Sequence, residues 1–130
     1  MTLRTLLVAD AVLALVSAAA LLVIPGQFVA PFGATLDPAG TFMAQGWGTS
    51  LLGLGVASWV SRDAGAHARR TVAIADAVEW IGTAVLFAIG IANGTVNSLA
   101  ALWIVLSLLF GAAFVAAIAG IVFRDSEASA

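Results

Sequence analysis

The sequence predicts an all-α protein, a bundle of four transmembrane helices running up, down, up and down through the bilayer. Hydrophobic residues make up 62% of the 130 residues and charged residues only 9%, whereas about a quarter of the residues of a soluble domain are charged. So few charges do not cover the surface of a water-soluble domain, and lipid is therefore the expected solvent. The apolar residues also fall into four long stretches within one domain, residues 1–130.

Each stretch has nearly the length that a membrane span requires, which is about 20 helical residues for a hydrocarbon core of about 30 Å. The start of the chain also has the pattern of a signal peptide. We reject that interpretation because Asp10 interrupts the apolar region and because a similar segment recurs later in the chain. The predicted spans are Leu3–Ile24, Thr41–Val60, Thr71–Ala92 and Ser98–Phe123.

All basic residues occupy regions that a four-span topology places on one side of the membrane. The two connections on the other side, residues 25–40 and 93–97, contain no Lys or Arg. Because cytoplasmic loops are enriched in Lys and Arg, this asymmetry predicts that both termini and the middle loop are cytoplasmic. The basic residues are Arg4, Arg62, Arg69, Arg70 and Arg124.

The connection formed by residues 25–40 is more apolar than an ordinary loop. Its side chains include Phe28 and Phe32, which favour a re-entrant segment or a lid lying on the surface. Asp37 precedes Pro38, an arrangement typical of a turn or of a cap at the start of the second helix.

The two halves of the chain resemble each other, which predicts a duplicated helical hairpin. Arg4-Thr5 and the following segment 9–12 match Arg70-Thr71 and segment 75–78 at the same spacing. The first repeat covers about residues 4–63 and the second about 70–125. Because each copy has two spans, the copies share one orientation, and a pseudo-twofold axis along the membrane normal is expected.

Three acidic residues lie inside predicted spans, where an ionisable side chain costs roughly 2.5–3.5 kcal/mol on insertion scales. Asp76, Glu79 and Thr83 share one face of the third span, and Asp10 and Ser17 share one face of the first. If the repeat is real, the two faces oppose each other. The predicted buried polar site therefore consists of Asp10, Ser17, Asp76, Glu79 and Thr83.

Three interpretations of this polar site stay open. Carboxyl groups without a basic partner at low dielectric favour the protonated form, so the site is a candidate for binding protons or cations. Alternatively the carboxyl groups hydrogen-bond to hydroxyls or carbonyls and hold the helices in register. In the third, Asp10 and Asp76 lie near enough to the interface to pair with Arg62 or Arg124.

Small residues recur at four-residue spacing on the second and fourth spans. Such stripes allow two helices to approach closely where lipid supplies no hydrophobic drive. Packing within the chain is their usual meaning, and dimerisation is the alternative. Gly48 and Gly55 form a second small face on the second span. The predicted helix-packing residues are Gly46, Ser50, Gly53, Ala57, Ala112, Ala116 and Gly120.

The missing residue types narrow the chemistry. The chain contains no Cys, Lys or Tyr and a single histidine, His67. Thiolate chemistry, a lysine Schiff base and a Walker-type phosphate loop are thereby excluded, and one histidine does not make a metal site. We expect no cofactor and no metal. With no long basic segment, we also expect no nucleic-acid partner.

One segment resembles a group of small bacterial four-helix integral membrane proteins. The resemblance covers most of the first hairpin and the start of the third helix. It rests on Phe32-Gly33, Leu36-Asp37-Pro38-Ala39-Gly40, Gly48, and Leu51-Leu52-Gly53-Leu54-Gly55 with Trp59 and Arg62, followed by Arg69-Arg70. It implies the four-helix architecture and the bacterial cytoplasmic (inner) membrane, and it implies no catalytic residues.

The sequence thus favours a non-catalytic membrane protein whose environment is the lipid bilayer. It would be an accessory or assembly subunit bound to a membrane-protein partner, or a homo-oligomer. The alternative is a small proton- or cation-coupled transporter or channel that uses the buried carboxyl groups. An intramembrane enzyme is less favoured, because the spans carry no His, Cys, Lys or Tyr.

Overall fold

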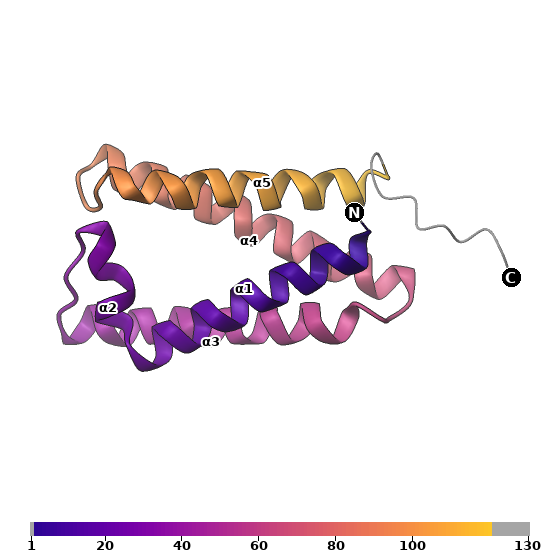
Figure 1. The fold of residues 1–130 in the computed structure, drawn as a ribbon, viewed down its shortest axis with the longest axis horizontal. Coiled ribbons are helices and arrows are strands. Elements are labelled where there is room, and N and C mark those ends of the chain that lie inside the picture. The colour runs from indigo at the N-terminus through magenta and orange to yellow at the C-terminus, as the bar shows by residue number, and fades with distance from the viewer. Residues whose placement is uncertain (1, 121–130) are drawn as a thin grey trace, which may run out of the picture.

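The computed structural model describes residues 2–120, and within them the fold is all-α, as predicted. Four long helices lie side by side as two antiparallel hairpins, α1 with α3 and α4 with α5 (Figure 1). The elements are α1 Leu3–Val23, α2 Pro25–Val29, η1 Ala30–Phe32, α3 Pro38–Ser61, α4 Ala66–Ala92, η2 Ser98–Ala100 and α5 Ala101–Ile118.

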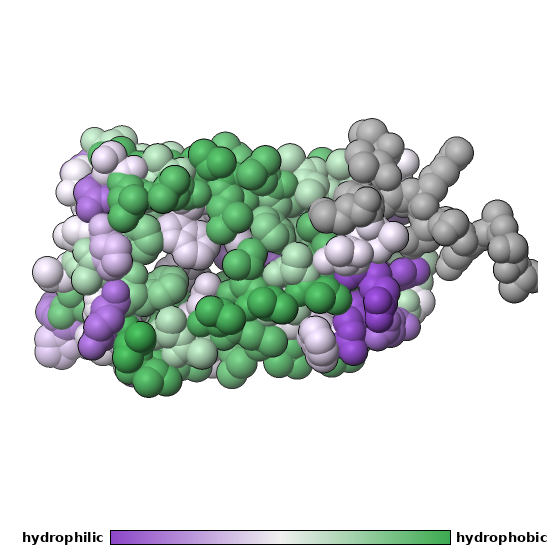
Figure 2. Space-filling view, in the orientation of Figure 1, coloured by the Kyte–Doolittle hydropathy of each residue, from purple (hydrophilic) through white to green (hydrophobic). Residues whose placement is uncertain are grey.

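Three segments are long and apolar enough to cross a membrane, judged by length and composition. They are Leu3–Val23, Ala66–Ala92 and Ser98–Ile118, which makes the chain a multi-pass membrane protein. In Figure 2 an apolar surface band separates polar residues at the two ends of the molecule. Helix α3, which contains the second predicted span, has 24 residues but is not among these three segments.

The helix boundaries follow local chemistry, and several of them differ from the prediction, most of all the start of α4 and the end of α5. Asp37 caps α3, because its Oδ1 accepts a hydrogen bond from the Gly40 amide at 2.6 Å. Helix α4 begins at Ala66, before the predicted Thr71, since its polar first turn is also helical. Helix α5 ends at Ile118 rather than continuing to Phe123, which lies outside the described residues.

Glycines bring α3 against α1 in the first hairpin. A Cβ atom at Gly48 would lie 2.9 Å from the Cβ of Leu21, and one at Gly55 would lie 2.9 Å from the Cγ of Leu15. Atoms in van der Waals contact are normally about 3.5–4.0 Å apart, so both positions exclude a side chain. Gly48 and Gly55 are the second set of small residues noted on this span in the sequence. In the structure they face inward, together with Leu51.

The stripe predicted to pack helices lies on the other side of α3. Gly46, Ser50 and Gly53 are exposed, and nothing within residues 2–120 lies within 4 Å of a Cβ built on either glycine. Among the described residues, Gly46 and Gly53 therefore make no close contact with another helix, unlike Gly48 and Gly55. Both faces consist of small residues, and composition alone did not distinguish them. Ala57, at the end of the stripe, is partly buried.

The small residues of α5 show a similar difference. Ala112 is exposed, Ala116 is partly buried, and Gly120 lies in the turn after the helix, with φ of 69°. The close approach to α4 is made instead by Gly111, where a Cβ would lie 3.0 Å from the Cγ1 of Ile81.

The two hairpins meet through different contacts at the two ends of the molecule. At the end that holds Arg4 and Arg62, called the arginine end below, an apolar cluster that includes Leu6, Ala73 and Phe114 joins α1, α4 and α5. At the opposite end, called the loop end, the Asn97 amide donates to the Phe32 carbonyl at 2.8 Å. The apolar lid predicted for residues 25–40 is formed by α2 and η1 at the loop end.

An aromatic group fixes this lid to the second hairpin. The ring of Phe32 lies 6.1 Å from that of Phe87 and 6.5 Å from that of Trp103. Phe28 of α2 lies 6.3 Å from Trp103. The first hairpin is thus tied to the second at both ends, with a polar group between them.

Candidate polar site between the two hairpins

Asp10 and Asp76 are buried, and each accepts a hydrogen bond from the other hairpin. Trp80 Nε1 of α4 donates to Asp10 Oδ1 of α1 at 2.6 Å, and Ser58 Oγ of α3 donates to Asp76 Oδ2 of α4 at 2.9 Å. The exposed fractions of Asp10 and Asp76 are only 3% and 2%. The carboxyl groups therefore link the hairpins, as expected of hydrogen-bonded groups between membrane helices.

Ser58 belongs to this site although sequence reasoning missed it. It is completely buried and continues the inward face of α3, three residues after Gly55. That spacing was the available signal, but the sequence did not show which small face of α3 was turned inward.

Glu79 and Thr83 form a separate pair on α4. Thr83 Oγ1 donates to Glu79 Oε1 at 2.9 Å, one helical turn away. Thr83 is buried, whereas Glu79 is partly exposed. Ser17 is also only partly buried, and the hydrogen bonds of Asp10 and Asp76 run to Trp80 and Ser58 instead. The predicted residues are thus brought near one another as two groups rather than one continuous seam.

The arrangement constrains which ions the site can hold. Asp10, Asp76 and Glu79 lie near enough to interact electrostatically. Within residues 2–120, however, no three Asp, Glu or His side chains are close enough together to hold a metal ion. Carboxyl groups in this position can form hydrogen bonds, exchange protons or attract a cation.

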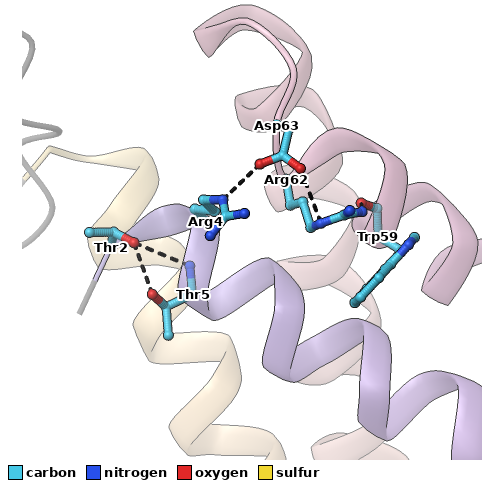
Figure 3. A network of polar contacts seen from close by, with 6 residues as sticks. All are labelled: Thr2, Arg4, Thr5, Trp59, Arg62 and Asp63. Carbon is cyan, nitrogen blue, oxygen red and sulfur yellow. Dashed lines mark hydrogen bonds and ion pairs between the residues drawn. The ribbon is translucent and has the colours of Figure 1, made fainter.

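Two arginines form ion pairs with Asp63 at the arginine end of the molecule. Arg4 Nε donates to Asp63 Oδ1 at 2.7 Å, and Arg62 Nε lies 3.2 Å from the other carboxylate oxygen (Figure 3). The Arg62 guanidinium also lies over the Trp59 ring, 3.9 Å from its centroid. The Arg4 hydrogen bond lowers the pKa of Asp63 below its ordinary value. Arg62 thus pairs with Asp63, while Arg124 lies outside the described residues.

A cavity of about 330 Å³ lies beside the polar site, toward the loop end. Trp47 of α3 lines one side of it, and α4 with the following connection lines the other. The lining is mainly apolar, with two threonine hydroxyls. Its residues are Trp47, Thr83, Leu86, Phe87, Gly90, Thr95 and Val96.

A buried hydroxyl on α5 has no hydrogen-bond partner in the described part of the chain. Ser107 on α5 is completely buried, and its hydroxyl makes no hydrogen bond. It lies on the same helix face as Gly111 and Phe114. Ser107 and Ser58 are therefore both fully buried, but they differ in hydrogen bonding. The Ser58 hydroxyl donates to the Asp76 carboxyl group, whereas the Ser107 hydroxyl has no partner among the described residues.

Comparison with known proteins adds no identification. The chain matches no protein-family model, no curated protein and no solved structure. The resemblance of the segment around Asp37 to small bacterial membrane proteins stays a prediction, as does the duplication of the hairpin.

Proposed function

We propose that this chain is a non-catalytic component of a bacterial cytoplasmic membrane that self-associates through one face of α3. The observation that carries the proposal is the exposed stripe of Gly46, Ser50 and Gly53. The glycines have open space where a side chain would be. Ser50 folds its hydroxyl back onto the Gly46 carbonyl at 3.3 Å, which satisfies its polarity within the helix.

The outward face of α5 differs from that of α3, and the difference supports self-association through α3. Most of its exposed residues are large and apolar, as lipid-facing residues usually are. They include Leu102, Val105 and Leu109, with exposed fractions of 66%, 57% and 64%. The α3 stripe instead has small residues next to Thr49, also exposed. Lipid chains make few favourable contacts with such a surface, whereas a second helix can approach it closely and make many van der Waals contacts.

A second copy of the chain is the partner that this stripe fits. A twofold interface is made from the same patch on both subunits, so one small face is sufficient for close contact on both sides. In this proposal α3 is the fourth membrane span. Its small and polar residues make it less hydrophobic than the three other segments. In the dimer these residues are covered by protein instead of lipid.

The proposed orientation places the arginine end in the cytoplasm. Arg4 and Arg62 meet there around Asp63, and the connections at the loop end contain no basic residue. A cysteine introduced at Ala66 should label only from the cytoplasmic side and one at Gly94 only from the outside. Labelling of both from one side would contradict the four-span topology.

Measurement of the monomer–dimer equilibrium in lipid tests the self-association. Gly46→Leu and Gly53→Leu have room in the isolated chain, so each should fold while weakening the dimer by about tenfold or more, the equivalent of about 1.4 kcal/mol. Gly82→Leu is the matched control, because Gly82 on α4 is also exposed with nothing within 4 Å of its Cβ. Single-molecule photobleaching in vesicles gives the dimer fraction.

A wild-type chain that stays monomeric at high density in the membrane would refute self-association. Recovery of a different membrane protein in fixed proportion from native membranes, lost in Gly46→Leu, would instead identify an accessory or assembly subunit. Equal effects of the Gly46 and Gly82 substitutions would show that the stripe has no special role.

The second candidate is a small proton- or cation-coupled transporter. It is favoured by the position of Asp10 and Asp76 between hairpins, where relative motion would alter their surroundings. It is opposed by the sequence, because no acidic residue follows Asp10 in α1 or Glu79 in α4 to continue a path toward the loop end. A pH-dependent flux in reconstituted vesicles that Glu79→Gln abolishes would favour this candidate.

A further inference from the structure

Glu79 does not itself line the cavity beside Trp47, but it is hydrogen-bonded to Thr83, which does. Glu79, Thr83, Leu86 and Gly90 follow the spacing i, i+4, i+7 and i+11 and therefore form one stripe along α4. The last three line the cavity, and Glu79 hydrogen-bonds to the first of them at 2.9 Å. The carboxyl group of Glu79 thus lies at the arginine-end limit of an apolar cavity.

The ionisable side chains nearest the cavity are acidic, whereas two of the arginines lie at the arginine end. Asp10, Asp76 and Glu79 lie within the helices nearby, whereas Arg4 and Arg62 are engaged with Asp63 at the arginine end. Glu79 differs from the two aspartates because its hydrogen-bond partner is on its own helix and because it is partly exposed. Among the three, it is the carboxyl group that is partly exposed and that is bonded to a residue of the cavity lining.

The remaining lining suits a flat or bulky apolar group. Trp47 and Phe87 contribute aromatic rings, and Leu86 and Val96 contribute aliphatic surface. Aromatic faces attract organic cations, and they do so more strongly where water is excluded. The volume of about 330 Å³ lies at the lower end of the range of ligand pockets, about 300–1,000 Å³.

We propose that this cavity binds a small hydrophobic organic cation that enters from the bilayer, with its positive group at Glu79 and its apolar part against Trp47 and Phe87. A lipid acyl chain would also fill the apolar space, but it would leave the Glu79 carboxyl with its Thr83 hydrogen bond and no cationic partner. The carboxyl group, the aromatic rings and the nearby aspartates together favour a monovalent cation. The site lies between α3 and α4, away from the exposed α3 stripe, and does not depend on self-association.

Binding of a matched pair of probes to the full chain in lipid nanodiscs tests this proposal. The cation is (2-naphthylmethyl)trimethylammonium, and the neutral probe is 2-naphthylmethanol, which has the same ring system. We expect the wild type to bind the cation with at least about tenfold higher affinity after correction for partition into empty nanodiscs. Glu79→Gln should remove that preference and leave binding of the neutral probe unchanged.

Asp37→Asn is the control for the loss of one negative charge. Asp37 caps α3 at the loop end, and asparagine caps a helix about as well as aspartate. This variant should keep the full preference for the cation. Gly46→Leu should also keep it, which separates a failure of this proposal from a failure of the self-association proposal.

A second measurement needs no variant at Glu79. Dicyclohexylcarbodiimide, a hydrophobic reagent, modifies carboxyl groups within membranes, and mass spectrometry locates the modified residue. The cation should slow modification of Glu79 in the wild type, and the neutral probe should not. Equal affinity for the two probes, or no protection of Glu79 by the cation, would overturn the proposal and indicate occupation by lipid tails only.

Discussion

The two faces of α3 carry similar residues but have opposite environments. Gly48 and Gly55 press against α1, whereas Gly46 and Gly53 face outward with open space around them. The inward face also carries Ser58, which bonds Asp76. The outward face carries Ser50, which bonds only its own backbone. A stripe of small residues therefore shows that close contact is possible, and the surrounding helices decide which partner makes it.

The largest expected effect comes from filling the inward face. Gly48→Leu should destabilise the chain by about 3 kcal/mol or prevent folding, because overpacking a dense contact is costly. The first atom added would already meet the Cβ of Leu21 and the Ala18 carbonyl oxygen. Unfolding of monomeric protein in mixed detergent micelles measures the change.

The same substitution on the outward face gives the contrast. Gly53→Leu should leave the monomer as stable as the wild type or up to about 1 kcal/mol more stable, since leucine has the higher helix propensity. A comparable loss of stability in both variants would show that the outward face is packed within the chain, contrary to this structure.

The two buried serines should show a smaller contrast of the same kind. Ser58→Ala removes the donor to Asp76 and should cost about 1 kcal/mol, within the range measured for hydrogen bonds between membrane helices. Ser107→Ala removes a hydroxyl that has no partner in the described chain and should be neutral or stabilising by up to about 1 kcal/mol. Both are read from the same unfolding titration. Equal costs would mean that Ser107 is satisfied in the membrane.

Much of the fold was predictable from local signals. Pro25-Gly26 ends the first predicted span, Asp37-Pro38 starts α3, and the position of the arginines agrees with the pairing of Arg4 and Asp63 at one end. These features depend on a few neighbouring residues. The start of α4 was placed too late, because the arginines beside it were treated as loop residues although they extend the helix.

The polar site was only partly predictable, because it depends on how helices are rotated against each other. The burial of Asp10 and Asp76 was expected from their depth in the predicted spans. Their partners, Trp80 and Ser58, come from the opposite hairpin, and no periodicity within one helix identifies them. Ser17 was included because of the suspected repeat, and the structure leaves it outside the hydrogen-bonded group.

Cysteine cross-linking in native membranes tests the central claim, self-association through the outward face of α3, most directly. The chain has no natural cysteine, so Ser50→Cys and Val105→Cys each introduce a single thiol, on α3 and on the exposed face of α5. A disulfide requires Cα atoms no more than about 7 Å apart. The account predicts that oxidation converts Ser50→Cys into covalent dimers, that Gly46→Leu suppresses them, and that Val105→Cys stays monomeric. Cross-linking of Val105→Cys as efficient as that of Ser50→Cys, or none at position 50, would contradict it.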